Sequence, residues 1–364
     1  MEEMVAELRK AYGGKRVFLT GHTGFKGGWL ALWLRELGAT VTGYSLAPDT
    51  NPSLFEVARV GVGVRHLEGD VRDLQHLRRA LAEAKPDYVF HLAAQALVRR
   101  SYDDPITTLQ TNVLGTANVL EALRLERRPC AAVMVTSDKC YENRGWVHGY
   151  REDDAMGGHD VYSMSKGAAE LVIASWRRSF FAPEALDSHR IAVASARAGN
   201  VIGGGDWCLD RIVPDCVRAL AAGGPVPVRN PRSVRPWQHV LEPLGGYLLL
   251  GAKLAAGRAD LCAPWNFGPR LEDAQPTQRL VELFIERWGE GRWEDRHDPR
   301  EPHEAKFLRL SIEKAQALLG WLPRWCLRQA VEKTADWYRS YYLDRPAQGM
   351  RELCVQQIRA YEKS

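Results

Sequence analysis

Hydrophobic residues in the first 200 positions follow two alternating patterns. Short apolar runs of strand length are each followed by a longer stretch in which apolar residues recur at the spacing of one helix face. The expected strands are residues 16–20, 40–45, 64–71, 87–94, 131–137 and 191–197. The expected helices are residues 1–14, 28–37, 73–84, 103–126 and 161–181. This alternation predicts an α/β fold, a doubly wound parallel sheet with helices on both faces.

The regular alternation ends after residue 200, where glycine-rich and proline-rich segments interrupt the pattern. Short extended pieces are expected at 225–229, 234–239 and 265–268, and helices at 212–222, 276–288, 311–319, 327–343 and 349–364. We therefore expect two parts. Residues 1–200 form a Rossmann-like domain, and residues 201–364 form mainly a smaller C-terminal lobe, with the chain free to cross back between them.

Composition excludes several functional classes. The chain has 364 residues, 45% hydrophobic and 26% charged, with a formal net charge of +4 and interleaved acids and bases. This slight excess gives no nucleic-acid footprint, and no apolar run is long enough to span a bilayer. The N-terminus carries no secretory apolar segment. Seven dispersed cysteines without a C-x-x-C pair fit a reducing cytoplasm, and no histidine spacing indicates a metal site.

A glycine-rich turn joins the first expected strand to the first long helix. It reads Gly21-His-Thr-Gly-Phe-Lys-Gly27. Glycines let the backbone turn tightly and approach a pyrophosphate, and the helix N-terminus offers free N–H groups to it. This context predicts dinucleotide binding; the alternative is a glycine-rich turn without a ligand. Lys26 within the turn is expected either to contact a cofactor phosphate or to point into water.

The second strand ends at Ser45, where an acid would bind the ribose of NAD or an arginine the 2′-phosphate of NADP. Serine does neither, and the lack of a nearby arginine favours NAD. Ligands of such sheets lie beyond the carboxyl ends of the strands. Five residues fall at or just past those ends, namely Gly21, Asp70, Ala93, Ser137 and Asn200.

Tyr162 and Lys166 lie four residues apart at the start of an expected helix. That spacing places both side chains on one helix face, where the ammonium favours the phenolate and makes the tyrosine a usable base. Tyr-x-x-x-Lys also occurs by chance, so the pair gains meaning from the sheet and the glycine-rich turn around it.

These motifs resemble the extended short-chain dehydrogenase/reductase superfamily, in the branch that acts on nucleotide sugars. The resemblance rests on Thr20-Gly-x-x-Gly-Phe-x-Gly27, Gly69-Asp-Val71, His91-Leu-Ala-Ala94, Asn112, Thr136-Ser137 and Tyr162-x-x-x-Lys166. It runs from about residue 16 to residue 343. Longer segments at 21–29, 136–141, 199–207 and 235–243 resemble in particular the CDP-glucose 4,6-dehydratases.

The resemblance implies NAD as cofactor, CDP-glucose as substrate and CDP-4-keto-6-deoxyglucose as product, on a pathway to deoxysugars such as those of the lipopolysaccharide O-antigen. The cofactor contacts implied are Gly21, His22, Thr23, Gly24, Phe25, Lys26, Gly27, Ser45, Asp70, Val71, Ala93, Ala94, Asn112, Tyr162 and Lys166. Substrate contacts are expected from Ser137, Asn200, Arg211 and Arg235, with Arg232 and Arg270 as competitors for the diphosphate.

Catalytic roles follow from the same resemblance. Tyr162 is the expected base for the sugar C4 hydroxyl, with Lys166 holding its pKa down and Ser137 bonding the C4 oxygen. Asp138 is the expected acid for the departing C6 hydroxyl. Lys139 either takes the C5 proton or positions the group that does; dTDP-sugar dehydratases carry a glutamate here.

Two other functions stay open on the sequence. A nucleotide-sugar 4-epimerase or reductase needs the Tyr–Lys pair without the Asp138–Lys139 pair, and a catalytically silent NAD-binding protein needs neither. A homodimer or homotetramer is expected from the resemblance, with residues 103–126 and 161–181 forming a four-helix contact. The expected location is the cytoplasm.

Overall fold

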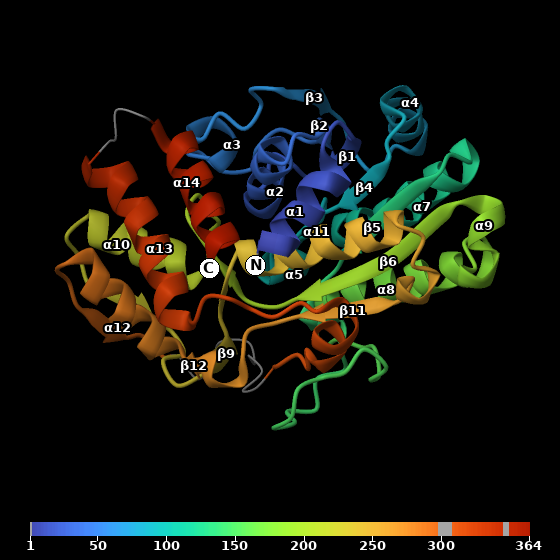
Figure 1. Ribbon diagram of the computed structural model, residues 1–364. Helices are drawn as coiled ribbons and strands as arrows, with labels where there is room; N and C mark the ends of the chain where they lie inside the picture. Colours follow the sequence, from blue (N-terminus) through green and yellow to red (C-terminus); the bar gives the residue numbers. More distant parts are fainter. Residues whose placement is uncertain (1, 298–307, 345–348) are drawn as a thin grey trace.

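One seven-stranded parallel sheet organises the structure, a computed structural model that describes residues 2–297, 308–344 and 349–364. The strands lie in the order β11-β6-β5-β4-β1-β2-β3 (Figure 1). Their bounds are β1 (Arg16–Thr20), β2 (Thr40–Ser45), β3 (Val64–Glu68), β4 (Tyr88–His91), β5 (Cys130–Val135), β6 (Ile191–Ala198) and β11 (Pro264–Phe267). The order reverses between β1 and β4, the point at which doubly wound sheets bind ligands. The predicted fold class is confirmed.

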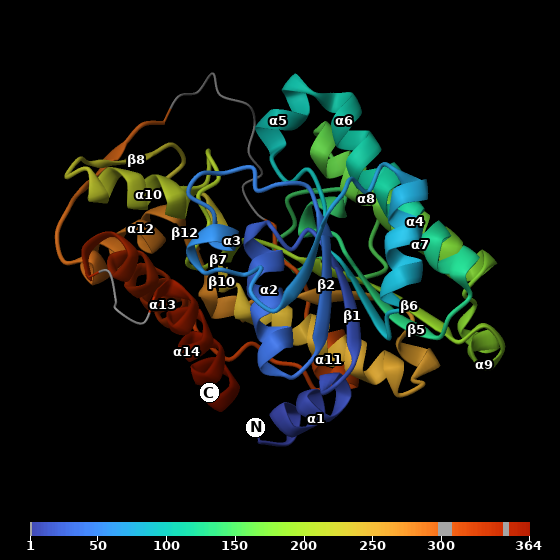
Figure 2. The ribbon, with the colours of Figure 1, turned by 90° about the horizontal axis from the view of Figure 1, so that it is seen from above.

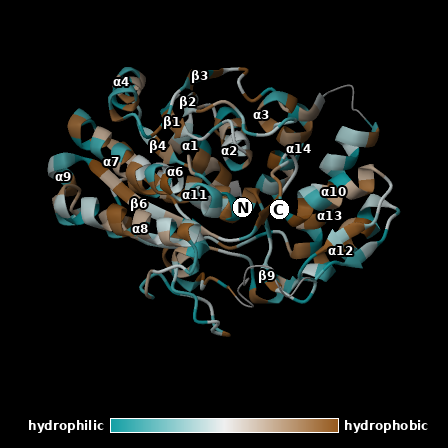
Figure 3. Cartoon of the chain, turned by 180° about the vertical axis from the view of Figure 1, so that it is seen from behind, coloured by the Kyte–Doolittle hydropathy of each residue, from teal (hydrophilic) through white to brown (hydrophobic). Residues whose placement is uncertain are grey.

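Helices cover both faces of this sheet (Figure 2). One face carries α1 (Glu2–Tyr12), α2 (Phe25–Glu36) and α11 (Leu241–Ala255), and the other carries α4 (Leu74–Ala84), α7 (Gly115–Glu126) and α8 (Val161–Ser179). Hydrophilic and hydrophobic segments alternate along helices such as α8, α12 and α13 (Figure 3), as expected for helices with one buried face. Asp73 caps α4 as predicted, its side chain accepting from the His76 N–H.

Two helical segments differ from the sequence predictions. The expected helix 103–126 is broken into α5 (Val98–Asp103), α6 (Pro105–Leu109), the π-helix η1 (Gln110–Leu114) and α7. Asp104 caps α6 and Pro105 opens it, which favours a new helix start over continuation. Helix α11 was not predicted. It is buried nearly all round and contains Pro243, so it shows little of the polar periodicity that identifies a surface helix.

The remaining elements form a lobe beside the carboxyl ends of the strands (Figure 1). Its helices are α10 (Ile212–Ala221), α12 (Thr277–Trp288), α13 (Leu327–Arg339) and α14 (Gly349–Lys363). Short strand pairs join β8 (Val226–Val228) to β13 (Trp293–Asp295), β9 (Val234–Pro236) to β12 (Ala274–Pro276), and β7 (Val201–Ile202) to β10 (Gln238–His239). The expected helix 311–319 ends in the π-helix η6 (Ala315–Leu319), and 327–343 ends in η7 (Ser340–Asp344).

Short helices complete the described chain: α3 (Leu54–Val57), α9 (Leu186–His189) and the 3₁₀ turns η2 (Asp138–Cys140), η3 (Pro183–Ala185), η4 (Ala259–Leu261) and η5 (Leu271–Asp273). Both α11 and β11 follow residue 200 in the chain. β11 is a strand of the large sheet and α11 packs against one face of it, so the chain returns from the lobe to the sheet. The division at residue 200 stays a prediction. Within the described ranges, the helices are too short or too polar to cross a membrane.

Candidate active site

A cavity of about 630 Å³ lies between the carboxyl ends of the strands and the lobe. From the sheet side it is lined by the segments after β1, β4, β5 and β6, and from the lobe by residues of 206–235 and by Thr277. Parallel strands end at one edge of a sheet, so residues far apart in the sequence meet here. Each of the five strand-end residues predicted from the sequence, Gly21, Asp70, Ala93, Ser137 and Asn200, lines the cavity.

The glycine-rich turn is packed too closely for larger residues. Gly21 has φ of +79°, and a Cβ there would lie 2.7 Å from the Ala93 nitrogen. A Cβ on Gly27 would lie 2.0 Å from the Gly21 carbonyl oxygen. Gly24 is the N-cap residue of α2, and it has no side chain to accept a hydrogen bond from the helix. The first N–H groups of α2 can therefore bind an anion. The turn therefore fits a dinucleotide pyrophosphate.

The end of β2 is held against this turn. The Thr23 hydroxyl lies 2.7 Å from the Ser45 hydroxyl and donates to the Leu46 carbonyl at 2.9 Å. Asp70, at the end of β3, is bound by Arg72 through its backbone N–H and its guanidinium, and this ion pair holds the pKa of the carboxyl below its usual range. The cavity wall at this end is thus polar and rigid, which suits an adenosine ribose.

Two predicted cofactor residues point away from the cavity. The His22 ring lies behind the turn, under Gly43, with Nε2 2.7 Å from His66 Nδ1, and burial lowers its pKa to about 4. Asn112 is buried and bonds Gln95 at both backbone groups and the Ser165 hydroxyl at 2.9 Å. It therefore holds the segment after β4 against α8. The other predicted cofactor residues line the cavity.

Lys26 does not point into water, and its contact with a cofactor phosphate stays a prediction. It lines the cavity and donates to the Tyr247 hydroxyl at 3.3 Å. Burial, together with the Lys166 and Arg211 charges, lowers its pKa to about 7, and the Asp138 charge opposes this shift. Lys26 thus stands among the predicted catalytic groups, a position that its place in the turn did not indicate.

The five predicted catalytic residues, Ser137, Asp138, Lys139, Tyr162 and Lys166, all line the cavity. Ser137 to Lys139 follow β5, while Tyr162 and Lys166 lie in the first turns of α8. Asp160 caps that helix by accepting from the Ser163 N–H at 2.8 Å. The Ser137 hydroxyl donates to Asp138 Oδ1 at 3.0 Å.

The expected low pKa of Tyr162 does not hold for the protein alone. Burial raises the pKa of the phenol to about 12, although the Ser137 hydrogen bond and the Arg211 charge favour the phenolate. Burial also lowers the pKa of Lys166 to about 8. Desolvation of the phenol thus outweighs the hydrogen bond and the charge that favour the phenolate.

Asp138 is a buried carboxyl at the cavity wall. Its side chain is buried, and this burial raises the pKa of the carboxyl despite the nearby Lys139, Arg235 and Lys26 charges. Its Oδ2 faces Gly199 and has no hydrogen-bond partner among the described residues. Asp138 also lines the cavity, so a carboxyl whose pKa is raised is placed to donate a proton to a ligand bound there.

The lobe side of the cavity supplies cations. Arg211 is paired with Asp206 at 2.8 Å, and Arg235 is buried with its Nη1 bonding the Val234 carbonyl. Sequence analysis missed Arg229, which lines the cavity and pairs with Asp210 at 2.9 Å. The competitor Arg270 instead bonds the Pro323 carbonyl. Arg229 follows β8, and the position of β8 beside the cavity places this arginine in the cavity wall. The sequence pattern does not distinguish it from arginines on the surface.

The sheet is doubly wound, and a glycine-rich turn lies at its switch point. Ser137, after β5, lines the same cavity as Tyr162 and Lys166 of α8. Together these features define a dinucleotide-binding enzyme of the short-chain dehydrogenase/reductase type. The model of the GDP-mannose 4,6 dehydratase family matches residues 18–246. A curated relative, CDP-glucose 4,6-dehydratase of Salmonella typhimurium, is 50% identical over 90% of this chain and 91% of its own. The chain belongs to this nucleotide-sugar dehydratase family.

More distant relatives share the fold. A UDP-glucose 4-epimerase of Mycolicibacterium smegmatis is 27% identical over 89% of this chain and 99% of its own. Among solved structures, the dTDP-glucose 4,6-dehydratase of Streptomyces venezuelae with NAD and TYD bound has a TM-score of 0.74 at 23% identity, covering 91% of this chain and 100% of that one. The UDP-glucose 4-epimerase of Thermotoga maritima has a TM-score of 0.76 at 21% identity, covering 89% and 99%.

Proposed function

We propose that the protein dehydrates CDP-glucose to CDP-4-keto-6-deoxyglucose, with NAD as a resident cofactor. The observation that carries this proposal is Asp138, a buried carboxyl with a raised pKa beside Ser137 and in the same cavity as Tyr162. An epimerase has no use for an acid at this place. The curated relative at 50% identity supports the choice of CDP-glucose.

The cavity divides between cofactor and substrate. Gly21, Gly24 and Gly27 with the N-terminus of α2 would hold the pyrophosphate of NAD, and Ser45 and Asp70 its adenosine side. Arg235, Arg211 and Asn200, with Arg229, would hold the diphosphate of the sugar nucleotide. Bound there, NAD would supply a hydride acceptor for C4 and a hydride donor for C6, and it would be recycled once a proton returns to C5.

Tyr162 takes the proton of the C4 hydroxyl, and Ser137 bonds the same oxygen. The Ser137 hydroxyl and Arg211 are the groups that favour its phenolate. The ketone formed at C4 acidifies the C5 proton, which Lys139 takes or helps to place. Asp138 donates its proton to the C6 hydroxyl, which leaves as water. The product is lighter than the substrate by one water.

The test is incubation of the purified protein with CDP-glucose, with and without added NAD, followed by mass spectrometry. Loss of one water with no net reduced cofactor supports the dehydratase. An unchanged mass with inverted C4 by NMR would establish the epimerase. No change with CDP-, dTDP- or GDP-sugars would favour a silent NAD-binding protein.

Asp138→Asn tests the role of the acid. General acids contribute about 10²–10⁴-fold to rates, so dehydration should fall by about that factor. Asp187→Asn, on the exposed helix α9, is the matched control and should keep full activity. A dehydration rate within about 3-fold of wild type in Asp138→Asn would remove Asp138 from the mechanism, because it lies well under that range.

We also propose a cytoplasmic homodimer or homotetramer acting in deoxysugar synthesis, such as that for lipopolysaccharide O-antigen. Supporting the assembly, Met164 and Leu171 lie two turns apart on α8 and are 40% and 62% exposed, and Ile106 on the adjacent α6 is 61% exposed. Exposed apolar side chains on neighbouring helices fit a four-helix contact between two copies.

A further inference from the structure

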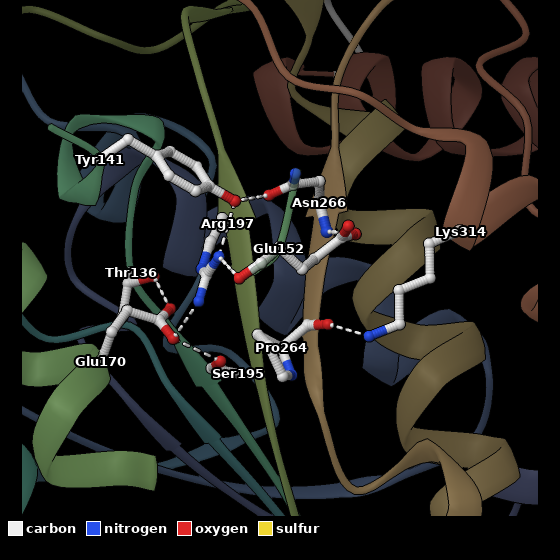
Figure 4. A network of polar contacts seen from close by, with 9 residues as sticks. All are labelled: Thr136, Tyr141, Glu152, Glu170, Ser195, Arg197, Pro264, Asn266 and Lys314. Atoms are coloured by element: carbon white, nitrogen blue, oxygen red, sulfur yellow. Dashed lines mark hydrogen bonds and ion pairs between the residues drawn. The ribbon is translucent and has the colours of Figure 1, made fainter. Parts of the chain in front are cut away.

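A buried ion pair joins α8 to β6 beside Thr136, the residue that precedes the predicted catalytic segment 137–139 (Figure 4). Arg197 Nη2 donates to Glu170 Oε2 at 2.9 Å, and both side chains are almost fully buried. Glu170 also accepts from the hydroxyls of Ser195 at 2.7 Å and Thr136 at 2.5 Å. Burial opposes ionisation of Glu170, but the Arg197 charge and these hydrogen bonds outweigh it and hold the pKa of the carboxyl below its usual range.

The pair ties down both ends of the segment that carries Ser137, Asp138 and Lys139. Before this segment, the Thr136 hydroxyl bonds Glu170. After it, the Tyr141 hydroxyl accepts from Arg197 Nη1 at 2.6 Å and donates to Asn266 Oδ1 at 2.8 Å. Residues 137–139 therefore lie between two anchored residues, Thr136 and Tyr141, whose contacts with the ion pair are drawn in Figure 4.

Glu170 also links this segment to the helix of the other catalytic groups. Tyr162, Lys166 and Glu170 follow at four-residue spacing on α8 and share one helix face. The Glu170 charge favours the ammonium form of Lys166. One carboxylate thus contacts the strand-end segment, stands on the Tyr–Lys helix and binds the arginine of β6.

Stability alone is a weak reason for such a pair. A buried ion pair is often no more stabilising than well-packed apolar residues of the same volume, whereas removing one partner is strongly destabilising. A pair that joins three elements at the edge of a catalytic cavity has a geometric use, because reactive groups must be held within a fraction of an ångström of their working positions.

We propose that Glu170 and Arg197 are a positioning pair that holds the 137–139 segment in register with Tyr162 and Lys166. The inference rests on the proposed function. Tyr162, on α8, takes the C4 proton, and Ser137 is the one residue of the segment that acts at C4. The other two, Asp138 and Lys139, act at C6 and C5. Loosening the segment therefore slows elimination more than C4 oxidation. A displacement of about 1 Å costs a rate of about 10²-fold.

Three variants test the pair. Glu170→Gln keeps the shape and removes the charge. Thr136→Val removes a single hydroxyl without leaving a buried charge unpaired. Glu170→Gln with Arg197→Met removes both charges, so its folding does not suffer from an isolated arginine. Glu242→Gln, another fully buried glutamate bonded to Trp325 and Tyr361, is the matched control.

Two readouts are needed. In a single turnover with CDP-glucose, the reduced cofactor should accumulate in the three variants, as followed by its near-ultraviolet absorbance. The dehydrated product should form about 10²-fold more slowly than in wild type. In the protein without substrate, hydrogen exchange of the peptide spanning 136–141 should rise in the same variants. Glu242→Gln should match wild type in both readouts.

A proportional loss of oxidation and elimination in all three variants, with unchanged exchange at 136–141, would overturn the proposal and leave the pair a purely structural feature. So would recovery of full activity in the double variant. If wild-type protein itself forms no dehydrated product, the proposed function fails, while the exchange measurement still decides whether Glu170 and Arg197 hold the segment.

Discussion

Gly27 offers the sharpest test of the glycine-rich turn. A Cβ at this position would lie 2.0 Å from the Gly21 carbonyl oxygen and 2.9 Å from the His22 Cα. Carbon and carbonyl oxygen approach to about 3.3 Å at the closest, so Gly27→Ala forces α2 and the turn apart by roughly 1 Å. The helix is otherwise buried on most sides, with Trp29 and Trp33 fully enclosed, and has little room to move.

The energetic cost can be bounded from packing. Forcing one extra methyl into a well-packed interior costs about 1–3 kcal/mol. For a chain of this size that lowers the melting temperature by about 1–4 °C. If the same ~1–3 kcal/mol destabilises the conformation of the turn that binds the pyrophosphate, the dissociation constant for NAD rises about 5–150-fold.

Gly24→Ala separates packing from ligand contact. Its Cβ would come no closer than 3.4 Å to the Gly21 oxygen, an ordinary contact, and Gly24 has φ of −79°. We therefore expect an unchanged melting temperature. Gly24 lines the cavity at the N-terminus of α2, so the methyl would stand where the pyrophosphate approaches, and NAD affinity should fall about 10-fold or more.

The assay is thermal unfolding plus NAD titration by tryptophan fluorescence, on protein stripped of bound nucleotide. Gly224→Ala, whose Cβ would be 3.7 Å from its nearest neighbour, is the control and should change neither quantity. Wild-type stability and affinity in Gly27→Ala would refute the close approach of helix and turn. Unchanged affinity in Gly24→Ala would refute the pyrophosphate site.

Two further predictions concern stability and assembly. Burial raises the pKa of Glu242 to about 7 from 4.5, so the folded state holds a proton that the unfolded state has lost. The free energy of unfolding should therefore fall by about 3 kcal/mol as pH rises from about 4.5 to about 7, and Glu242→Gln should abolish this slope in urea unfolding; an unaltered slope would contradict the assignment. Leu171→Asp should shift the mass measured by light scattering to the monomer, whereas Val62→Asp, equally exposed at 60%, should not; an unchanged mass in Leu171→Asp would place the interface elsewhere.

The sequence by itself determined the sheet, the glycine-rich turn and which residues are the main candidates for catalysis. Strand and helix periods are local properties, and the parallel sheet then brings the carboxyl ends of the strands together whatever lies between them. That is why Gly21, Ser137 and Tyr162 could be assigned to one site. Spacing along a helix likewise placed Tyr162 and Lys166 on one face.

Only the tertiary structure decided how each group behaves there. Residues distant in the chain decide where a side chain points and whether it is buried. Examples are the side-chain orientations of His22 and Asn112, the burial of α11 and the position of Arg229 in the cavity wall. The pKa of a side chain follows its desolvation and the charges around it, neither of which a local pattern contains. Burial thus raised the pKa of Asp138, and chain packing paired Glu170 with Arg197.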